Sequence, residues 1–170
     1  MKKETYIKMT QPYRDNPNMA KGLHIANKIC TGIMYLAYPL LLVYLFFYGK
    51  YSSYLSFWKA FFVPAVSFVF LTVVRAVINR PRPYEKFEVA PVIPKDTKGN
   101  SFPSRHVFSA SIIALTFIFH SPWVEVGLVF LVVSILLAVV RVVSGVHYIS
   151  DVIAGIAVAV IAALVGYIII

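Results

Sequence analysis

The chain has 170 residues, enough for one domain, and 59% of them are hydrophobic. Charged residues make up 14%, against about 25% in a typical soluble domain, so the composition excludes an ordinary soluble protein and indicates a bilayer protein. Lys and Arg number 16 and Asp and Glu number 7. This positive excess suits either anionic lipid and phosphate partners or ordinary cytoplasmic loops of a membrane protein.

The first 28 residues are polar and basic, and they contain no apolar core that could serve as a cleavable signal. We predict a basic N-terminal segment over residues 1–28, within which residues 18–28 form a short helix on the membrane surface. Residues 29–170 are then expected to form a single transmembrane domain. The only cysteine, Cys30, excludes an internal disulfide framework.

Five apolar segments follow in chain order, each close to the roughly 20 residues that a spanning helix needs. The expected spans are residues 29–48, 54–78, 105–120, 124–143 and 147–170. Pro39 is expected to kink the first of them. The fold class is therefore predicted to be all-α, a polytopic membrane bundle of about five transmembrane helices with an interfacial N-terminal segment.

The longest connection, residues 79–103, is rich in proline and has no apolar periodicity. Segments of this length without regular structure are often functional, so this one is a candidate lid over a site, and its mobility stays open.

Ionisable residues are rare in the last third of the chain, where Arg141 and Asp151 stand almost alone. Charged groups at membrane depth are costly and by default mark function. In an alternating bundle, the connection before residue 105 and the turn before residue 147 lie on the same membrane face. Nine residues are then expected to converge there, namely Arg75, Arg80, Arg82, Ser104, Arg105, His106, Arg141, His147 and Asp151.

The residue types in this group suit phosphoryl transfer. His147 and Asp151 are four residues apart, which would place them on one helix face and let the carboxylate orient the ring for attack. Ser104 stands at a predicted helix start, where free backbone N–H groups suit a phosphate. Arginine forks match phosphate oxygens and stabilise a charged transition state.

These residues resemble the signature of the type 2 phosphatidic acid phosphatase family, the membrane relatives of the vanadium haloperoxidases. The family's first motif is Lys, six residues and Arg-Pro, and it matches Arg75 with Arg82. The second is Pro-Ser-Gly-His, which matches residues 103–106. The third is Ser-Arg, five residues, His, three residues and Asp, which matches residues 140–151. The resemblance covers residues 54–170.

Three positions depart from the family pattern. Arg75 replaces Lys, Arg105 replaces Gly and Val140 replaces Ser. None of these changes affects the two histidines or Asp151, so activity is still expected. Family members usually have six spans, and this chain is expected to lack the first.

The resemblance implies a role for each residue. His147 would be the nucleophile, Asp151 would orient it, and His106 would be the general acid and then the base. The phosphate would be bound by Arg75, Arg82, Ser104, Arg105 and Arg141. No metal or other cofactor is expected. Arg80 lies outside the motif register and is interpreted as an interfacial anchor.

The implied function is a metal-independent lipid phosphatase that works through a phosphohistidine, with the bilayer and an anionic lipid phosphate as partners and no nucleic acid. Candidate substrates are undecaprenyl diphosphate, phosphatidylglycerol phosphate and phosphatidic acid. A lipid phosphotransferase, and a non-catalytic lipid-phosphate binder or transporter, remain as alternatives. Oligomeric state stays open.

The expected location is the bacterial plasma membrane, with several spans. The resemblance places the site on the extracytoplasmic face, where bacterial relatives mostly work. The basic N-terminal segment favours the cytoplasmic face by the positive-inside rule, because with five spans it lies on the same side as the site. Lys50 and Lys59 are the main charges expected on the opposite side.

Overall fold

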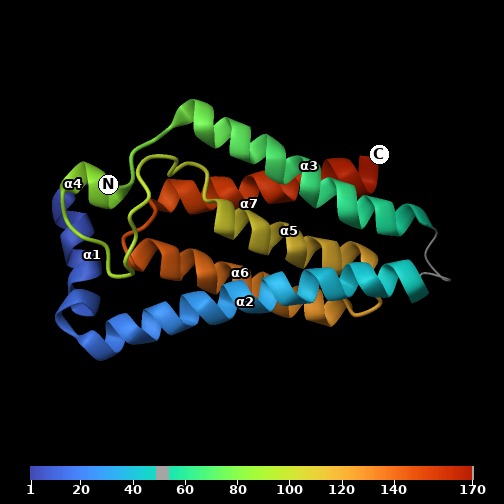
Figure 1. Ribbon diagram of the computed structural model, residues 1–170, viewed down its shortest axis with the longest axis horizontal. Helices are drawn as coiled ribbons and strands as arrows, with labels where there is room; N and C mark the ends of the chain where they lie inside the picture. The colour runs from blue at the N-terminus through green and yellow to red at the C-terminus, as the bar shows by residue number, and fades with distance from the viewer. Residues whose placement is uncertain (49–53, 170) are drawn as a thin grey trace.

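The computed structural model describes residues 1–48 and 54–169, and in this part of the chain the regular structure is entirely helical (Figure 1). The predicted all-α class is therefore confirmed. The elements in chain order are α1 (Lys3–Asp15), α2 (Pro17–Tyr48), α3 (Tyr54–Ile78), α4 (Pro83–Phe87), α5 (Arg105–His120), α6 (Val124–Val143), α7 (Ile149–Ala163) and the π-helix η2 (Leu164–Ile169).

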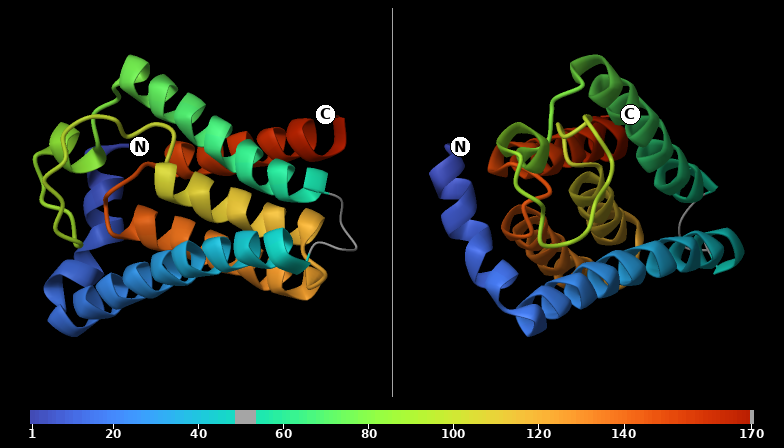
Figure 2. Two further views of the ribbon diagram at one scale, coloured as in Figure 1. Left: turned by 45° about the vertical axis from the view of Figure 1, so that its right-hand side comes forward. Right: turned by 60° about the vertical axis from the view of Figure 1, so that its left-hand side comes forward.

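The five long helices are α2, α3, α5, α6 and α7. They lie side by side along the molecule, with α5 in the middle (Figures 1 and 2). It packs against α2, α3, α6 and α7. With 16 residues it is roughly 24 Å long, which is shorter than the roughly 30 Å hydrocarbon core of a bilayer. A short helix is tolerated here because protein, rather than lipid, surrounds most of its side chains.

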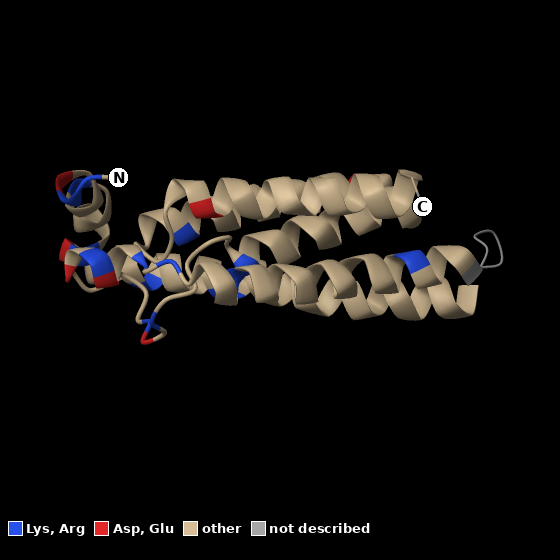
Figure 3. Cartoon of the chain, turned by 90° about the horizontal axis from the view of Figure 1, so that it is seen from above, with Lys and Arg blue, Asp and Glu red and all other residues tan. Residues whose placement is uncertain are grey.

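The helices around α5 have the length and the apolar surface of membrane-spanning helices. Within the described residues, four segments are long and apolar enough to cross a membrane: Pro17–Tyr48, Leu55–Phe87, Val124–Val143 and Ile149–Ile169. Large apolar side chains such as Leu36, Val77 and Ile161 are exposed on their outward faces, as contact with lipid tails requires. Lys and Arg gather mainly at the end of the bundle that holds the N-terminus (Figure 3).

The helix boundaries test the predicted spans. The predictions for 54–78, 105–120 and 124–143 coincide with α3, α5 and α6. The prediction of a surface helix over residues 18–28 is wrong, because α2 begins at Pro17 and these residues form its first turns. Pro39 lies inside the continuous α2. Lys50 and Ile170 lie outside the described residues.

The helix that runs across the end of the bundle is α1, upstream of the predicted position (Figures 1 and 2). Its residue Tyr6 is fully buried and packs in a cluster with Phe87 and Tyr148. The Tyr6 hydroxyl donates to the carbonyl oxygens of Val89 at 3.2 Å and Gly145 at 3.4 Å. Burial raises the pKa of Tyr6 to about 12, so the hydroxyl remains a donor. In this way α1 fastens two loops at the charged end.

The proline-rich connection contains one short helix, α4. Glu85 closes its first turn by accepting the Arg82 N–H at 3.0 Å, and it also accepts the Gly99 N–H at 2.7 Å. Further along, the Val92 N–H donates to the Ser144 carbonyl oxygen at 2.9 Å. The connection is therefore tied both to itself and to the turn before α7.

Candidate active site

A pocket of about 230 Å³ opens at the charged end of the bundle, beneath the proline-rich connection. Five of the nine residues that were expected to converge line it, together with three further residues of the connection. The lining residues are Thr72, Arg75, Ala76, Arg82, Lys95, Thr97, Asn100, Arg105, His106 and His147. A cavity with four positive side chains, two histidines and small polar groups is suited to a phosphate group.

His147 is 1% exposed, and its Nδ1 lies 3.5 Å from Oδ2 of the fully buried Asp151. The expectation that the two share a helix face is wrong, because α7 begins at Ile149 and His147 lies in the turn before it. The pair meets because Asp151 caps the helix, accepting the Tyr148 N–H at Oδ2 over 3.0 Å. With Nδ1 at the carboxylate, Nε2 is the nitrogen left for chemistry in the pocket.

The electrostatic surroundings keep His147 uncharged. Burial lowers its pKa to about 4, and the positive charges of Arg141 and Arg82 act in the same direction, while Asp151 opposes them. The same burial and the neighbouring arginines lower the pKa of Lys95 in the pocket wall. A neutral imidazole has a free lone pair, which a nucleophile needs.

The second histidine, His106, lies in the first turn of α5. Nη2 of Arg141 is 2.9 Å from its Nδ1. A guanidinium group is donor-only, so Nδ1 accepts this bond and the ring proton is on Nε2. Arg141 is itself 4% exposed, and its Nη1 donates to Asn27 on α2 at 3.3 Å. This network holds His106 in one orientation beside the pocket.

Two further arginines are anchored through backbone carbonyl groups. Arg75 donates to the carbonyl oxygens of Asn100 and Pro103, which tie α3 to the end of the connection. Arg82 donates through Nε to Gly99 at 3.0 Å. Each guanidinium group is thereby oriented while part of it still faces the pocket.

The remaining two predicted phosphate ligands are placed differently. Arg105 lines the pocket, and its guanidinium carbon lies 5.6 Å from the centre of the Phe68 ring. Ser104 precedes α5 as its N-cap, as predicted, but its hydroxyl is buried without a hydrogen-bond partner and does not line the pocket. The geometry supports a phosphate contact for Arg105 more directly than for Ser104.

Three residues contact the site without having been given a role in it from the sequence, although Arg80 was expected at this end of the bundle. The interfacial-anchor interpretation of Arg80 is wrong, since its Nη1 pairs with Oδ1 of Asp151 at 2.8 Å. Ser101 donates its hydroxyl to Oδ2 of Asp151 at 2.5 Å. Asn27 supports Arg141 from α2. The Arg-Pro repeat around Arg80 was the one available signal, and nothing in the local sequence marks the other two.

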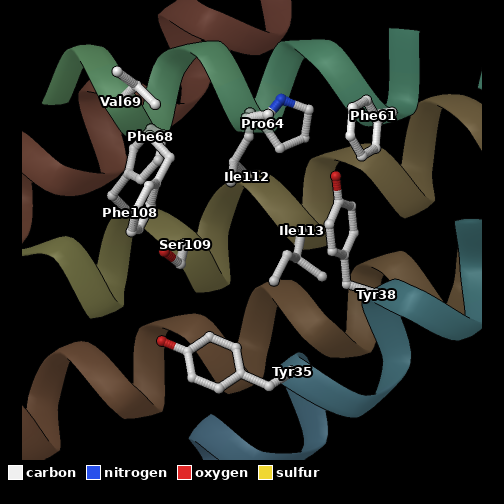
Figure 4. A pocket seen from close by; sticks show the side chains of 11 residues that line it. Tyr35, Tyr38, Phe61, Pro64, Phe68, Val69, Phe108, Ser109, Ile112 and Ile113 are labelled. Atoms are coloured by element: carbon white, nitrogen blue, oxygen red, sulfur yellow. The ribbon is translucent and has the colours of Figure 1, made fainter. Parts of the chain in front are cut away.

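An apolar cavity of about 460 Å³ lies between α2, α3 and α5 (Figure 4). Tyr35 and Tyr38 come from α2, and Phe68, near the end of the cavity closer to the pocket, comes from α3. Phe68 is also the ring beside Arg105, so the charged pocket and the apolar cavity adjoin. Farther from the pocket, the Tyr38 hydroxyl donates to the Ala60 carbonyl oxygen at 2.9 Å and ties α2 to α3.

Possible metal ligands are dispersed. Within residues 1–48 and 54–169, no group of three or more His, Cys, Asp or Glu side chains is arranged to hold a metal ion. The positive groups that a phosphate would meet are the side chains of arginine and lysine.

Solved structures with the same fold are known. The chain resembles LpxE of Aquifex aeolicus with a TM-score of 0.72 and 20% identity, covering 96% of this chain and 92% of that one. It also resembles a PAP2-type phosphatidylglycerolphosphate phosphatase of Bacillus subtilis, with a TM-score of 0.66, 18% identity and coverage of 96% and 83%. At these identities the likeness establishes the fold. No curated protein sequence matches the chain.

The sequence also matches a family model, that of the PAP2 superfamily, over residues 56–170. The matched region begins in α3 and includes all the residues that line the pocket. This chain belongs to the PAP2 superfamily.

Proposed function

We propose that this protein is a membrane lipid phosphatase that transfers the phosphoryl group of its substrate to His147. The observation that carries the proposal is the pairing of two cavities. The charged pocket holds both histidines, and it adjoins an apolar cavity at the contact between Arg105 and Phe68. A lipid phosphate has the two parts that would fill these cavities, because its phosphate suits the charged pocket and its hydrocarbon chain suits the apolar cavity.

In the first step, Nε2 of His147 attacks phosphorus while the bond from phosphorus to the lipid oxygen breaks. Asp151 holds Nδ1–H and balances the positive charge that develops on the ring. The leaving oxygen takes a proton from Nε2 of His106. Arg75, Arg82 and Arg105 stabilise the negative charge of the transferring group.

His106 can be an effective acid only as an imidazolium, and Arg141 occupies its Nδ1 in the structure described here. For His106 to act as the acid, the contact between Arg141 and Nδ1 must open so that Nδ1 can take a proton, and the negative charge of a bound phosphate favours that protonated form.

In the second step, His106 removes a proton from water, the water oxygen attacks phosphorus, and the bond from phosphorus to Nε2 breaks. Inorganic phosphate leaves and His147 returns to its neutral form. The arginines supply the positive charge throughout, so turnover is expected to persist with a chelator present.

The test is phosphate release from detergent-solubilised lipid phosphates and diphosphates with EDTA present. We expect release by the wild type and none by His147→Ala. His106→Asn is expected to accumulate phosphoenzyme with a substrate that has a good leaving group, detectable as an acid-labile phosphoramidate by mass spectrometry. No release from phosphatidic acid, phosphatidylglycerol phosphate or undecaprenyl diphosphate would favour a binder or transporter. Transfer to an added alcohol, without free phosphate, would favour a phosphotransferase.

For the membrane location we propose the bacterial plasma membrane, with the pocket on the extracytoplasmic face. Lys98 is exposed in the connection beside the pocket. In a Cys30→Ser background, Lys98→Cys should react with a membrane-impermeant thiol reagent added to intact cells. Labelling only after the cells are broken would place the pocket in the cytoplasm, as the positive-inside rule favours.

A further inference from the structure

Arg80 lies between α3 and α4, and its guanidinium group reaches the start of α7. Nη1 donates to Oδ1 of Asp151 and to the Ser150 hydroxyl, both at 2.8 Å. The guanidinium carbon lies 4.2 Å from the centre of the Tyr148 ring, within the range of a cation–π contact. The Arg80 carbonyl oxygen accepts the Ser101 N–H at 2.9 Å. The side chain and the backbone of Arg80 are therefore both fixed.

The two oxygens of Asp151 have separate sets of partners. Oδ2 accepts from the Ser101 hydroxyl at 2.5 Å and the Tyr148 N–H at 3.0 Å, and it faces His147. Oδ1 is paired with Arg80. Asp151 is fully buried, and a buried carboxylate needs a compensating charge. Among the described residues, Arg80 is the arginine that forms an ion pair with Asp151.

Arg80 is absent from the residues that line the charged pocket, whereas Arg75, Arg82 and Arg105 line it. The ion pair with Asp151 is the contact that links Arg80 to His147. A carboxylate gripped at both oxygens cannot rotate about its own axis, so the direction of Oδ2 toward His147 is set in part by the bond at Oδ1.

We propose that Arg80 is a positioning residue, which grips the second oxygen of Asp151 and so fixes the contact between Asp151 and His147. This inference rests on the proposed function, in which His147 is the nucleophile. It adds Arg80 to the histidines, the carboxylate and the arginines that the motifs define.

The positive charge of Arg80 should also affect the pKa of His147, in a direction that can be predicted. The titratable and charged groups around His147 come from all the neighbouring elements. They are Asp151 on α7, Tyr148 before it, Arg75 on α3, Arg80 and Arg82 before α4, Lys95 in the connection, Arg105 and His106 on α5, and Arg141 on α6. Removing Arg80 leaves the negative charge of Asp151 less offset, which favours the imidazolium. The pKa of His147 should then rise, and less of the ring would be the neutral nucleophile.

The experiment compares Arg80→Gln, Arg80→Lys and the matched control Lys98→Gln, which removes one positive charge from an exposed position of the same connection. Kinetics with a lipid phosphate separate kcat from KM. A 15N titration of the histidine rings, assigned with His147→Gln, gives the pKa of His147 without turnover.

Arg80→Gln should lower kcat roughly tenfold to a hundredfold, the size of a lost hydrogen bond to a charged group, with KM little changed and the pKa of His147 raised. Arg80→Lys keeps the charge but not the planar fork, so it should keep the pKa near the wild-type value and lower kcat less. Lys98→Gln should match the wild type in both measurements.

The inference would be overturned if Arg80→Gln had the wild-type kcat and the wild-type pKa of His147. It would also be overturned if Arg80→Gln raised KM and left kcat unchanged, because Arg80 would then be a substrate ligand. If Arg80→Gln fails to fold, wild-type kcat in Arg80→Lys would overturn it. If the wild-type protein releases no phosphate, the proposed function fails. The titration then still tests whether Arg80 acts on His147 through Asp151.

Discussion

The backbone N–H of Ser104 donates to the carbonyl oxygen of Asp151 at 2.8 Å, which joins the start of α5 to the first turn of α7. This bond fixes the distance between the second and third motifs without any side chain. The two helices come close enough for it because Gly155, one turn further along α7, packs directly on the Ser104 carbonyl group.

Gly155→Ala is expected to force α5 and α7 apart. The added Cβ would lie 2.8 Å from the Ser104 carbonyl oxygen and 3.3 Å from the Phe108 nitrogen, and both belong to the backbone. We expect a stability loss of about 1–3 kcal/mol and a lower kcat, measured by thermal unfolding and phosphate release in detergent. Gly32→Ala is the matched control, since its Cβ meets nothing within 4 Å. Equal behaviour of the two variants would contradict the close packing.

Gly145→Ala tests the attachment of α1 to the turn before α7. Gly145 has φ +77°, and an added Cβ would lie 2.5 Å from the Tyr6 hydroxyl oxygen. The left-handed conformation alone costs about 1–2 kcal/mol, and the clash displaces the turn that carries His147, so stability and kcat should both fall. Gly22→Ala, which meets nothing within 4 Å, should not lower either.

A double-mutant cycle sharpens this test. Tyr6→Phe removes the atom nearest to the new Cβ and should by itself cost only about 0.5–1.5 kcal/mol. Gly145→Ala should therefore cost less stability in the Tyr6→Phe background than in the wild type. Additive losses would mean that Tyr6 does not press on this turn.

Ala65→Trp should block the apolar cavity. Ala65 lines it from α3 and is exposed, so a larger side chain can enter without disturbing the core. We expect KM to rise for a long-chain lipid phosphate, with no change in turnover of a short, water-soluble phosphate ester. Val66→Trp is the control, because this neighbouring residue faces a different groove, between α3 and the C-terminal helices. An equal rise in KM in both variants would indicate a general effect on α3.

The His147 ring should stay neutral to unusually low pH. Its folded-state pKa of about 4 is below the unfolded value of about 6.5, because burial penalises the charged form. Between these two values the unfolded chain binds the extra proton, so the folded state loses stability as pH falls from about 6.5 to about 4. A 15N titration of the histidine rings, assigned with His147→Gln, measures the pKa of His147. A midpoint near 6.5 would show that the ring is not desolvated.

The sequence by itself determined the boundaries of three long helices and the end of the bundle at which the ionisable residues meet. Of the five predicted spans, 105–120 is not among the four described segments that are long and apolar enough to cross a membrane. Long apolar runs are bounded by prolines and charges, so α3, α5 and α6 begin and end where hydrophobicity does. The start of α2 was missed because its first turns, 17–28, are polar and lie beyond the apolar run. The motif spacing predicted that five residues would meet at one site, and they do line one pocket: Arg75, Arg82, Arg105, His106 and His147.

Only the tertiary structure decided which groups support these residues. Arg80 and Ser101 reach Asp151 from 71 and 50 residues away, and Asn27 reaches Arg141 from 114 residues away. Contacts of this kind leave no local pattern, because they depend on how helices pack and where loops cross. The same holds for His147, whose contact with Asp151 comes from a helix cap rather than a helix face. A spacing of four residues is compatible with either geometry, and only the backbone before α7 distinguishes them.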